Sequence, residues 1–274
     1  MLAQELIDNI LDHLHSETET LKSCAFVCRS FLPTCRLHLF ATLQISGSNI
    51  DRISELLIPP PNASTDDCDP NRRLRARIIR LLNAHTTDLT FVAPWDWPFN
   101  PTHHNFPRFT HLQRIVFKGD NPDYHTLPMH WWGKRFCSVQ SVEVNFDYMD
   151  KNRLILNTLC NIPSTVKNIS FTATRTTRLH LSSLRDVSET RTDTYHFNGT
   201  LGLNLACGVS HKELLLAMLR HRDLGVFEFK LRRINFNLTC RADIHPFALL
   251  VNECKDTLEF LNINYSTLCT QPML

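Results

Sequence analysis

The sequence predicts an α/β fold in which a small N-terminal unit of three helices precedes a curved parallel sheet of the solenoid type. Two observations lead to this fold class. Apolar residues recur with helical spacing from position 2 to position 43. Further along, short strand-like segments begin at Leu112, Val139 and Val166, at two equal intervals of 27 residues, and helical segments lie between several of the later strands.

The N-terminal helices follow from the spacing of the apolar positions. The first predicted helix covers residues 2–14, with acidic residues between the apolar ones. Ser16 or Thr18 is expected to cap a second helix, whose apolar stripe continues over residues 21–32. A third apolar segment covers residues 37–43.

This N-terminal stretch carries more apolar surface than three short helices can bury among themselves. Phe26 and Val27 lie off the main stripe of the second helix, which makes that helix apolar nearly all round. The missing cover comes either from the rest of the chain or from another protein, and composition leaves both open.

The same stretch resembles an F-box. The strings "LAQELIDNILDHL" and "TLKSCAFVCRSFLPTCRLHLFATLQI" cover about 45 of the 274 residues, and they are similar to the F-box-like proteins abundant in fungi. Ala3 stands where that family usually has proline. The matching positions are Leu2, Glu5, Leu6, Ile10, Leu11 and Leu14 in the first string and Leu21, Cys24, Val27, Cys28, Arg29 and Phe31 in the second.

The resemblance implies an adaptor rather than an enzyme: the substrate-recognition subunit of an SCF-type cullin–RING ubiquitin ligase. The helices would bind the SCF adaptor, the C-terminal repeats would hold a protein client, and other subunits would do the chemistry. A repeat-type interaction module with no ubiquitin-ligase role is the alternative, and an unrecognised enzyme is a third. The implied adaptor-binding residues are Leu2, Glu5, Leu6, Ile10, Leu14, Val27, Arg29 and Phe31, with Glu5 and Arg29 at the rim.

The chain divides into three parts on this view. Residues 1–45 form the F-box-like unit, residues 46–80 form a linker and a first helix, and residues 81–274 form the substrate-binding domain. The prolines and acidic residues of 59–73 mark the break. Five arginines follow between positions 72 and 80, and we interpret them as a solvated helix or strand edge rather than a nucleic-acid site.

The C-terminal part resembles an irregular leucine-rich repeat. Each of the three equally spaced segments, "LQRIVF", "VQSVEV" and "VKNISF", has apolar residues at its first, fourth and sixth positions. Further strands are expected from Phe197, Val226 and Leu258, and helices over 151–160, 210–224 and 244–254. An ordinary α/β domain with a mixed sheet is the alternative.

Composition and motifs exclude several functional classes. A net charge of +2 gives no reason to expect a nucleic-acid partner or an anionic membrane, and no apolar run is long enough to span a bilayer. The ten cysteines are scattered, which indicates a reducing compartment and predicts a cytoplasmic or nuclear protein. We find no catalytic motif and predict no cofactor or metal; His103, His104 and His111 are expected in an exposed loop.

All four tryptophans fall in segments between predicted strands, beside proline or glycine. They are Trp95, Trp97, Trp131 and Trp132. Loops along one rim of a solenoid form its binding surface, and tryptophan is favoured as an interface anchor. We therefore predict that these residues bind the client, with packing against the solenoid core as the alternative.

Changing Trp97 and Trp132 to alanine should reduce client capture in affinity purification while the thermal melt stays cooperative. If both variants lose their cooperative melt, the tryptophans are core residues.

Overall fold

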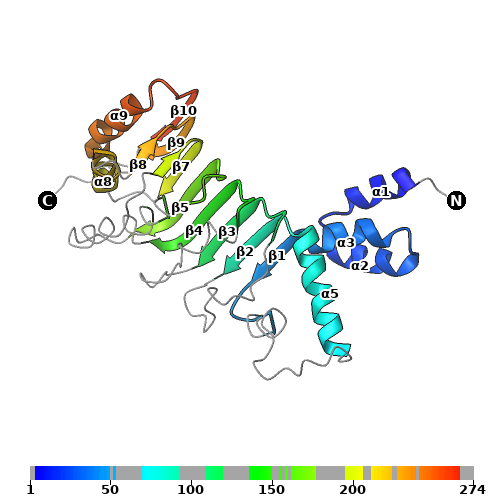
Figure 1. Ribbon diagram of the computed structural model, residues 1–274. Helices are drawn as coiled ribbons and strands as arrows, with labels where there is room; N and C mark the ends of the chain where they lie inside the picture. Colours follow the sequence, from blue (N-terminus) through cyan, green and yellow to red (C-terminus); the bar gives the residue numbers. More distant parts are fainter. Residues whose placement is uncertain are drawn as a thin grey trace.

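A computed structural model describes residues 4–49, 52–53, 70–92, 109–119, 136–149, 155, 158–159, 162–176, 195–205, 211–223, 227–238 and 241–265. These residues form three N-terminal helices followed by an open, curved sheet of eight parallel strands (Figure 1). The predicted α/β class and the curved parallel sheet are confirmed, and the mixed sheet is excluded for the described strands.

The N-terminal helices are α1 (Gln4–His13), α2 (Thr18–Val27) and α3 (Leu32–Ala41). The apolar stripe predicted over residues 21–32 as one helix is divided, because Cys28 is extended with φ −158° and ψ 167°. Pro33 lies in the first turn of α3, where its missing N–H costs nothing; inside a continuous helix it would remove a hydrogen bond. The N-cap of α2 is Glu17, not Ser16 or Thr18, and its side chain makes no capping bond.

Eight strands follow one another across the sheet in chain order, every pair parallel. They are β1 (Thr42–Ile45), β2 (Asp88–Val92), β3 (Arg114–Gly119), β4 (Ser141–Met149), β5 (Asn168–Thr176), β7 (Thr200–Leu205), β9 (Arg233–Leu238) and β10 (Phe260–Tyr265). A separate pair joins β6 (Tyr195–Phe197) to β8 (Phe227–Phe229). The remaining helical elements are α5 (Pro70–His85), α8 (Lys212–Asp223), the short 3₁₀ turn η4 (Arg241–Asp243) and α9 (Ile244–Glu253).

The 27-residue interval in the sequence equals the separation between residues that pair on neighbouring central strands. Arg114 pairs with Ser141, and Ser141 pairs with Asn168. At the entrance to β3, β4, β5, β9 and β10 one carbonyl accepts two N–H groups from the next repeat: the carbonyl of Gln113 accepts from Gln140 and Ser141 at 2.8 and 2.9 Å. This shared carbonyl fixes where each of these strands begins.

One predicted strand is assigned to the wrong segment. Residues from Val226 were expected in the main sheet, but Phe227–Phe229 is β8, and the main strand is the following "RINFNL" of β9. Two segments in this stretch have apolar residues at strand-like spacing. The segment that begins at Leu231, and not the one that begins at Val226, supplies the buried strand residues Ile234 and Phe236. Sequence patterns did not predict strands β1 and β2. Before β2, buried Thr86 stands at the position that Leu112 has before β3, so the apolar pattern of the repeat is broken there.

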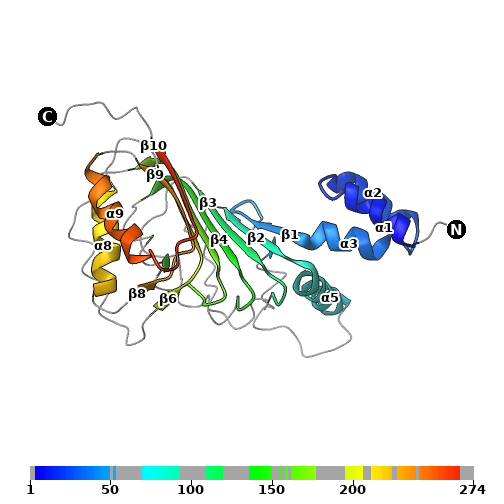
Figure 2. The ribbon, with the colours of Figure 1, turned by 90° about the horizontal axis from the view of Figure 1, so that it is seen from above.

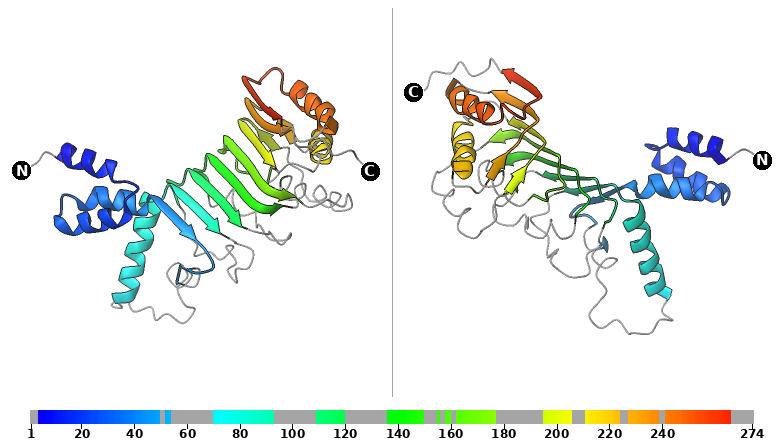
Figure 3. Two further views of the ribbon diagram at one scale, coloured as in Figure 1. Left: turned by 180° about the vertical axis from the view of Figure 1, so that it is seen from behind. Right: turned by 45° about the horizontal axis from the view of Figure 1, so that its top comes forward.

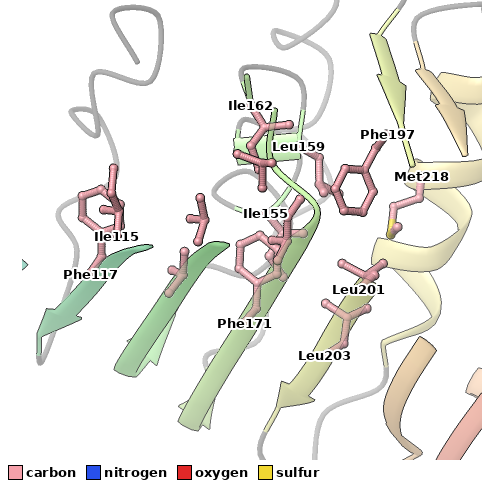
Figure 4. Packing of buried hydrophobic residues seen from close by; sticks show 14 of the residues in the cluster. Ile115, Phe117, Ile155, Leu159, Ile162, Phe171, Phe197, Leu201, Leu203 and Met218 are labelled. Carbon is pink, nitrogen blue, oxygen red and sulfur yellow. The ribbon is translucent and has the colours of Figure 1, made fainter. Parts of the chain in front are cut away.

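The main core lies on one face of the sheet. The second and fourth residues of each central strand point to this face and are buried, as Ile115 and Phe117 are in β3 (Figure 4). Ile155, Leu159 and Ile162 pack against these rows. The helices α8 and α9 cover the same face at the C-terminal end of the sheet (Figure 2).

The helical unit and the sheet meet at α3. Leu39 packs against the small core of the N-terminal helices, while the adjacent Phe40 packs against the main core. The chain then passes from Ala41 directly into β1, so Thr42–Ile45 belongs to the sheet although sequence analysis grouped it with the helices.

Gly199 precedes β7 at a place where the backbone of the previous repeat leaves no room for a side chain. A Cβ there would lie 2.0 Å from the carbonyl oxygen of Lys167, which accepts the N–H of Thr200. Gly199→Ala should therefore lower the free energy of unfolding by about 2 kcal/mol or more, measured by urea denaturation. Gly47→Ala is the matched control, because no atom lies within 4 Å of the Cβ position at Gly47. Equal effects of the two substitutions would contradict this account.

Candidate docking surface

The three N-terminal helices have a small core of their own. Ile7, Leu11, Leu21 and Cys35 are fully buried in it. Leu14 and Phe31, both expected to bind an adaptor, are half-buried and pack against this core, so they support the helical unit from within.

Polar contacts fix the orientation of α1 against α3. Asp8 accepts a hydrogen bond from the Thr34 hydroxyl, and the Asp12 carboxylate lies 2.8 Å from Nε2 of His38. At the start of the helix, Nε2 of Gln4 donates to the Ser30 carbonyl at 3.1 Å. These contacts turn the acidic side of α1 toward α3.

The opposite side of α1 presents apolar residues to solvent. Leu6 and Ile10 lie one turn apart, so they share a helix face, and they are 47% and 49% exposed. Phe26 and Val27, at the end of α2, are 90% and 68% exposed. We call these residues, together with the exposed Leu37 of α3, the N-terminal apolar set.

The residues expected from sequence to bind an adaptor therefore fall into three groups. Leu6, Ile10 and Val27 belong to the N-terminal apolar set, and Glu5 and Arg29 are also exposed. Leu14 and Phe31 lie at the small core. The third group is Leu2, which lies outside the described part of the chain. The residues expected to bind the client also lie outside it: Trp95, Trp97, Trp131 and Trp132.

Two members of the N-terminal apolar set were absent from the expected residues. They are Phe26, the most exposed large apolar side chain in the described residues, and Leu37. For Phe26 the sequence did carry a signal, because its position off the buried stripe of α2 left it no place in the core.

The cysteines of this unit differ in environment. The Ser30 hydroxyl lies 2.8 Å from the sulfur of exposed Cys28, and by stabilising the thiolate it lowers the pKa of Cys28. Burial raises the pKa of Cys35. Cys28 lies beyond the end of α2, so Cys24 and Cys28 do not share a helix face. No group of three or more His, Cys, Asp or Glu side chains suited to a metal ion occurs in the described residues.

A second accessible surface is the face of the sheet opposite the main core. Figure 2 shows α8 and α9 on the core side, and no described helix covers the other side. Most outward positions are polar, although Val116 and Phe260 also belong to the outward rows. Exposed asparagines occur on four successive strands of the main sheet, at Asn168, Asn204, Asn235 and Asn262.

One arginine ties three strands together on this polar face. The guanidinium of Arg114 forms two hydrogen bonds with the Glu143 carboxylate, at 2.8 and 2.9 Å, and its Nη1 lies 3.5 Å from Asp88. The Glu143 hydrogen bond in particular raises the pKa of Arg114 above its ordinary value. The single positive charge of Arg114 is thus held between two carboxylates, which leaves the group of three with one net negative charge.

Comparison with protein-family models, with curated proteins and with solved structures finds no match. In the part of the chain that the structure describes, none of the helices has the length and apolar character needed to cross a bilayer.

Cys28 should react with iodoacetamide at neutral pH faster than Cys35 or Cys254, because it is exposed and its pKa is lowered, whereas burial raises the pKa of the other two. Ser30→Ala removes the stabilising hydroxyl, so the pH at which Cys28 alkylation reaches half its maximal rate should move upward. Mass spectrometry of the native protein across a pH series measures both effects. Equal labelling of Cys28 and Cys35 would contradict the described environments.

Proposed function

We propose that this chain is an F-box-type substrate-recognition subunit of an SCF-type cullin–RING ubiquitin ligase, with an irregular leucine-rich-repeat-like client domain. The observation that carries the proposal is the N-terminal apolar set. It lies on the same short helices whose sequence resembles an F-box.

The exposure of these side chains is costly unless a partner covers them. Burying apolar surface contributes about 25 cal/mol per Å². The helical unit nevertheless keeps Phe26 almost wholly and Val27 about two-thirds exposed to water, while its own core buries only a few residues. A large exposed apolar surface on so small a unit is typical of a protein-docking site.

The docking surface is also preorganised. Asp8 and Asp12 hold one side of α1 against α3, which leaves Leu6 and Ile10 directed away from the unit in a fixed orientation. A partner that buries these residues does not have to order the helix first, so less binding free energy is lost to conformational entropy.

The sheet would serve as the client-holding part. Its polar outward face is wide, and its strands are locked in register by the shared carbonyls. Since α3 runs directly into β1, a client held on the sheet would stay at a defined distance from an adaptor bound to the helices. Ubiquitin transfer would then follow from proximity, with no catalytic group supplied by this chain.

One observation favours the alternative of an interaction module with no ubiquitin-ligase role. Phe40 of α3 packs against the main core, so the helical unit also covers the β1 end of the sheet. A unit that only capped the sheet would have no reason to expose Phe26 and Val27, which makes the docking function the better explanation.

Val27→Asp and Leu6→Asp should each weaken association with the SCF adaptor by roughly tenfold or more, because a carboxylate would be buried unpaired in an apolar contact. Co-purification of the full chain with the adaptor measures the loss. Both positions are exposed in the free protein, so the melting temperature should change little.

Leu74→Asp on α5 is the matched control, since Leu74 is an equally apolar exposed residue outside the N-terminal apolar set. This variant should bind the adaptor normally, and adaptor binding should protect Cys28, next to Val27, from alkylation. Full adaptor association by both Val27→Asp and Leu6→Asp would refute the docking surface. Client capture that survives in Val27→Asp and Leu6→Asp would separate the client-holding part from the docking part.

A further inference from the structure

The sheet ends at β10 in an apolar strand that nothing in the described residues covers. All six residues of β10 are exposed. Four of them are large and apolar: Phe260, Leu261, Ile263 and Tyr265. On one side β10 pairs with β9, and no described strand pairs with the backbone N–H and C=O groups of its other edge (Figure 3).

The exposed side chains of β10 continue the rows of the main core. Leu261 and Ile263 pair in register with Ile234 and Phe236 of β9, both of which are fully buried. In the solenoid each row is covered by the next strand, and at β10 this cover is missing. Ile244 and Leu249 of α9, at the same end of the molecule, are exposed as well (Figure 1).

The β10 edge also lacks the features that keep edge strands from pairing. Its sequence, "FLNINY", contains no charged residue and no proline. The opposite edge of the sheet is different: Leu43 of β1 is half-buried, Ile45 is buried, and α3 packs against α5 beside that strand. Of the two end strands of the described main sheet, only β10 therefore has its inward apolar side chains exposed.

We propose that β10 is a dimerisation edge, at which a second copy of this chain adds its own β10 in antiparallel orientation about a two-fold axis. The two eight-stranded sheets then become one continuous sheet across the contact. This proposal does not depend on the function proposed above.

The pattern of β10 is complementary to itself. Antiparallel partners point to the same face, so a two-fold axis through Asn262 places Leu261 of one copy opposite Ile263 of the other. The core-side apolar residues of the two copies then cover each other. Because the strand is uncharged, no like charges meet across the axis.

A second copy fits this edge better than continuation of the sheet in one direction. Head-to-tail addition would bring β10 to β1, where α3 and α5 are packed, and would leave a free edge on every new copy. Two-fold pairing joins the exposed apolar end strand of the described main sheet in each copy, and it closes at two chains.

Sedimentation velocity of the full chain tests the proposal between about 1 and about 100 µM, the range expected for a modest interface. The wild type should show a concentration-dependent dimer. Ile263→Lys should raise the dissociation constant by about tenfold or more, since an unpaired cation would then face the apolar side of the pair. Ile263 is already 42% exposed, so the variant should fold normally, as its thermal melt will show.

Leu74→Lys, the same kind of change at an exposed position on α5, should leave the dimer intact. The register itself is tested by the double variant Leu261→Glu with Ile263→Lys. It places a new carboxylate of each copy opposite the new ammonium of the other, so dimerisation should return and weaken with added salt.

Three results would overturn the proposal. One is a wild-type protein that stays monomeric over the whole concentration range, which is also the outcome if another segment of the chain or a different protein covers the edge. The second is an Ile263→Lys variant that dimerises like the wild type. The third is a double variant that fails to regain the dimer although it melts cooperatively.

Discussion

The whole structure depends on the burial of each strand's inward apolar pair against the pair of the next strand. In the middle of the sheet this contact is repeated without interruption, and the rings of Phe91 and Phe117 stack at 5.2 Å between centroids on neighbouring strands. The shared carbonyls before β3, β4, β5, β9 and β10 keep the pairs aligned. A chain organised in this way satisfies its core locally, strand by strand, and concentrates its unsatisfied apolar surface at the two ends.

The two ends use that surface in different ways. At the first end, α3 connects the sheet to a helical unit that has its own core. The exposed apolar residues at this end lie mainly on α1 and α2. At the other end the exposed residues belong to the last strand itself. Helix faces suit partners that insert side chains into them, whereas a strand edge suits a partner that supplies another strand.

The sequence predicted the class of the fold because the periodic residues determine it. The equal spacing of Leu112, Val139 and Val166 gave the parallel register, and the helical spacing of the first 14 residues gave α1. Prediction failed where the same rhythm occurred twice, as at Val226 and Leu231, and where Thr86 replaced an aliphatic residue. In the candidate docking surface, the exposure of Leu6, Ile10 and Val27 followed from the resemblance to an F-box, and that of Phe26 from its place off the buried stripe of α2. The exposure of Leu37 and the inward packing of Leu14 depend on how the three helices pack against one another, which periodicity does not specify.

The division of α3 between two cores has a mechanical consequence. Leu39 and Phe40 are neighbours in the chain, yet they are held by different clusters, so α3 cannot rotate or shift without disturbing both. Load placed on the helices is passed through α3 to β1 and from there into the hydrogen-bonded ladder of strands. The helical unit and the sheet are therefore joined by a helix that packs into both cores, and not by a flexible linker. Loosening either core would weaken the attachment of the other part to α3.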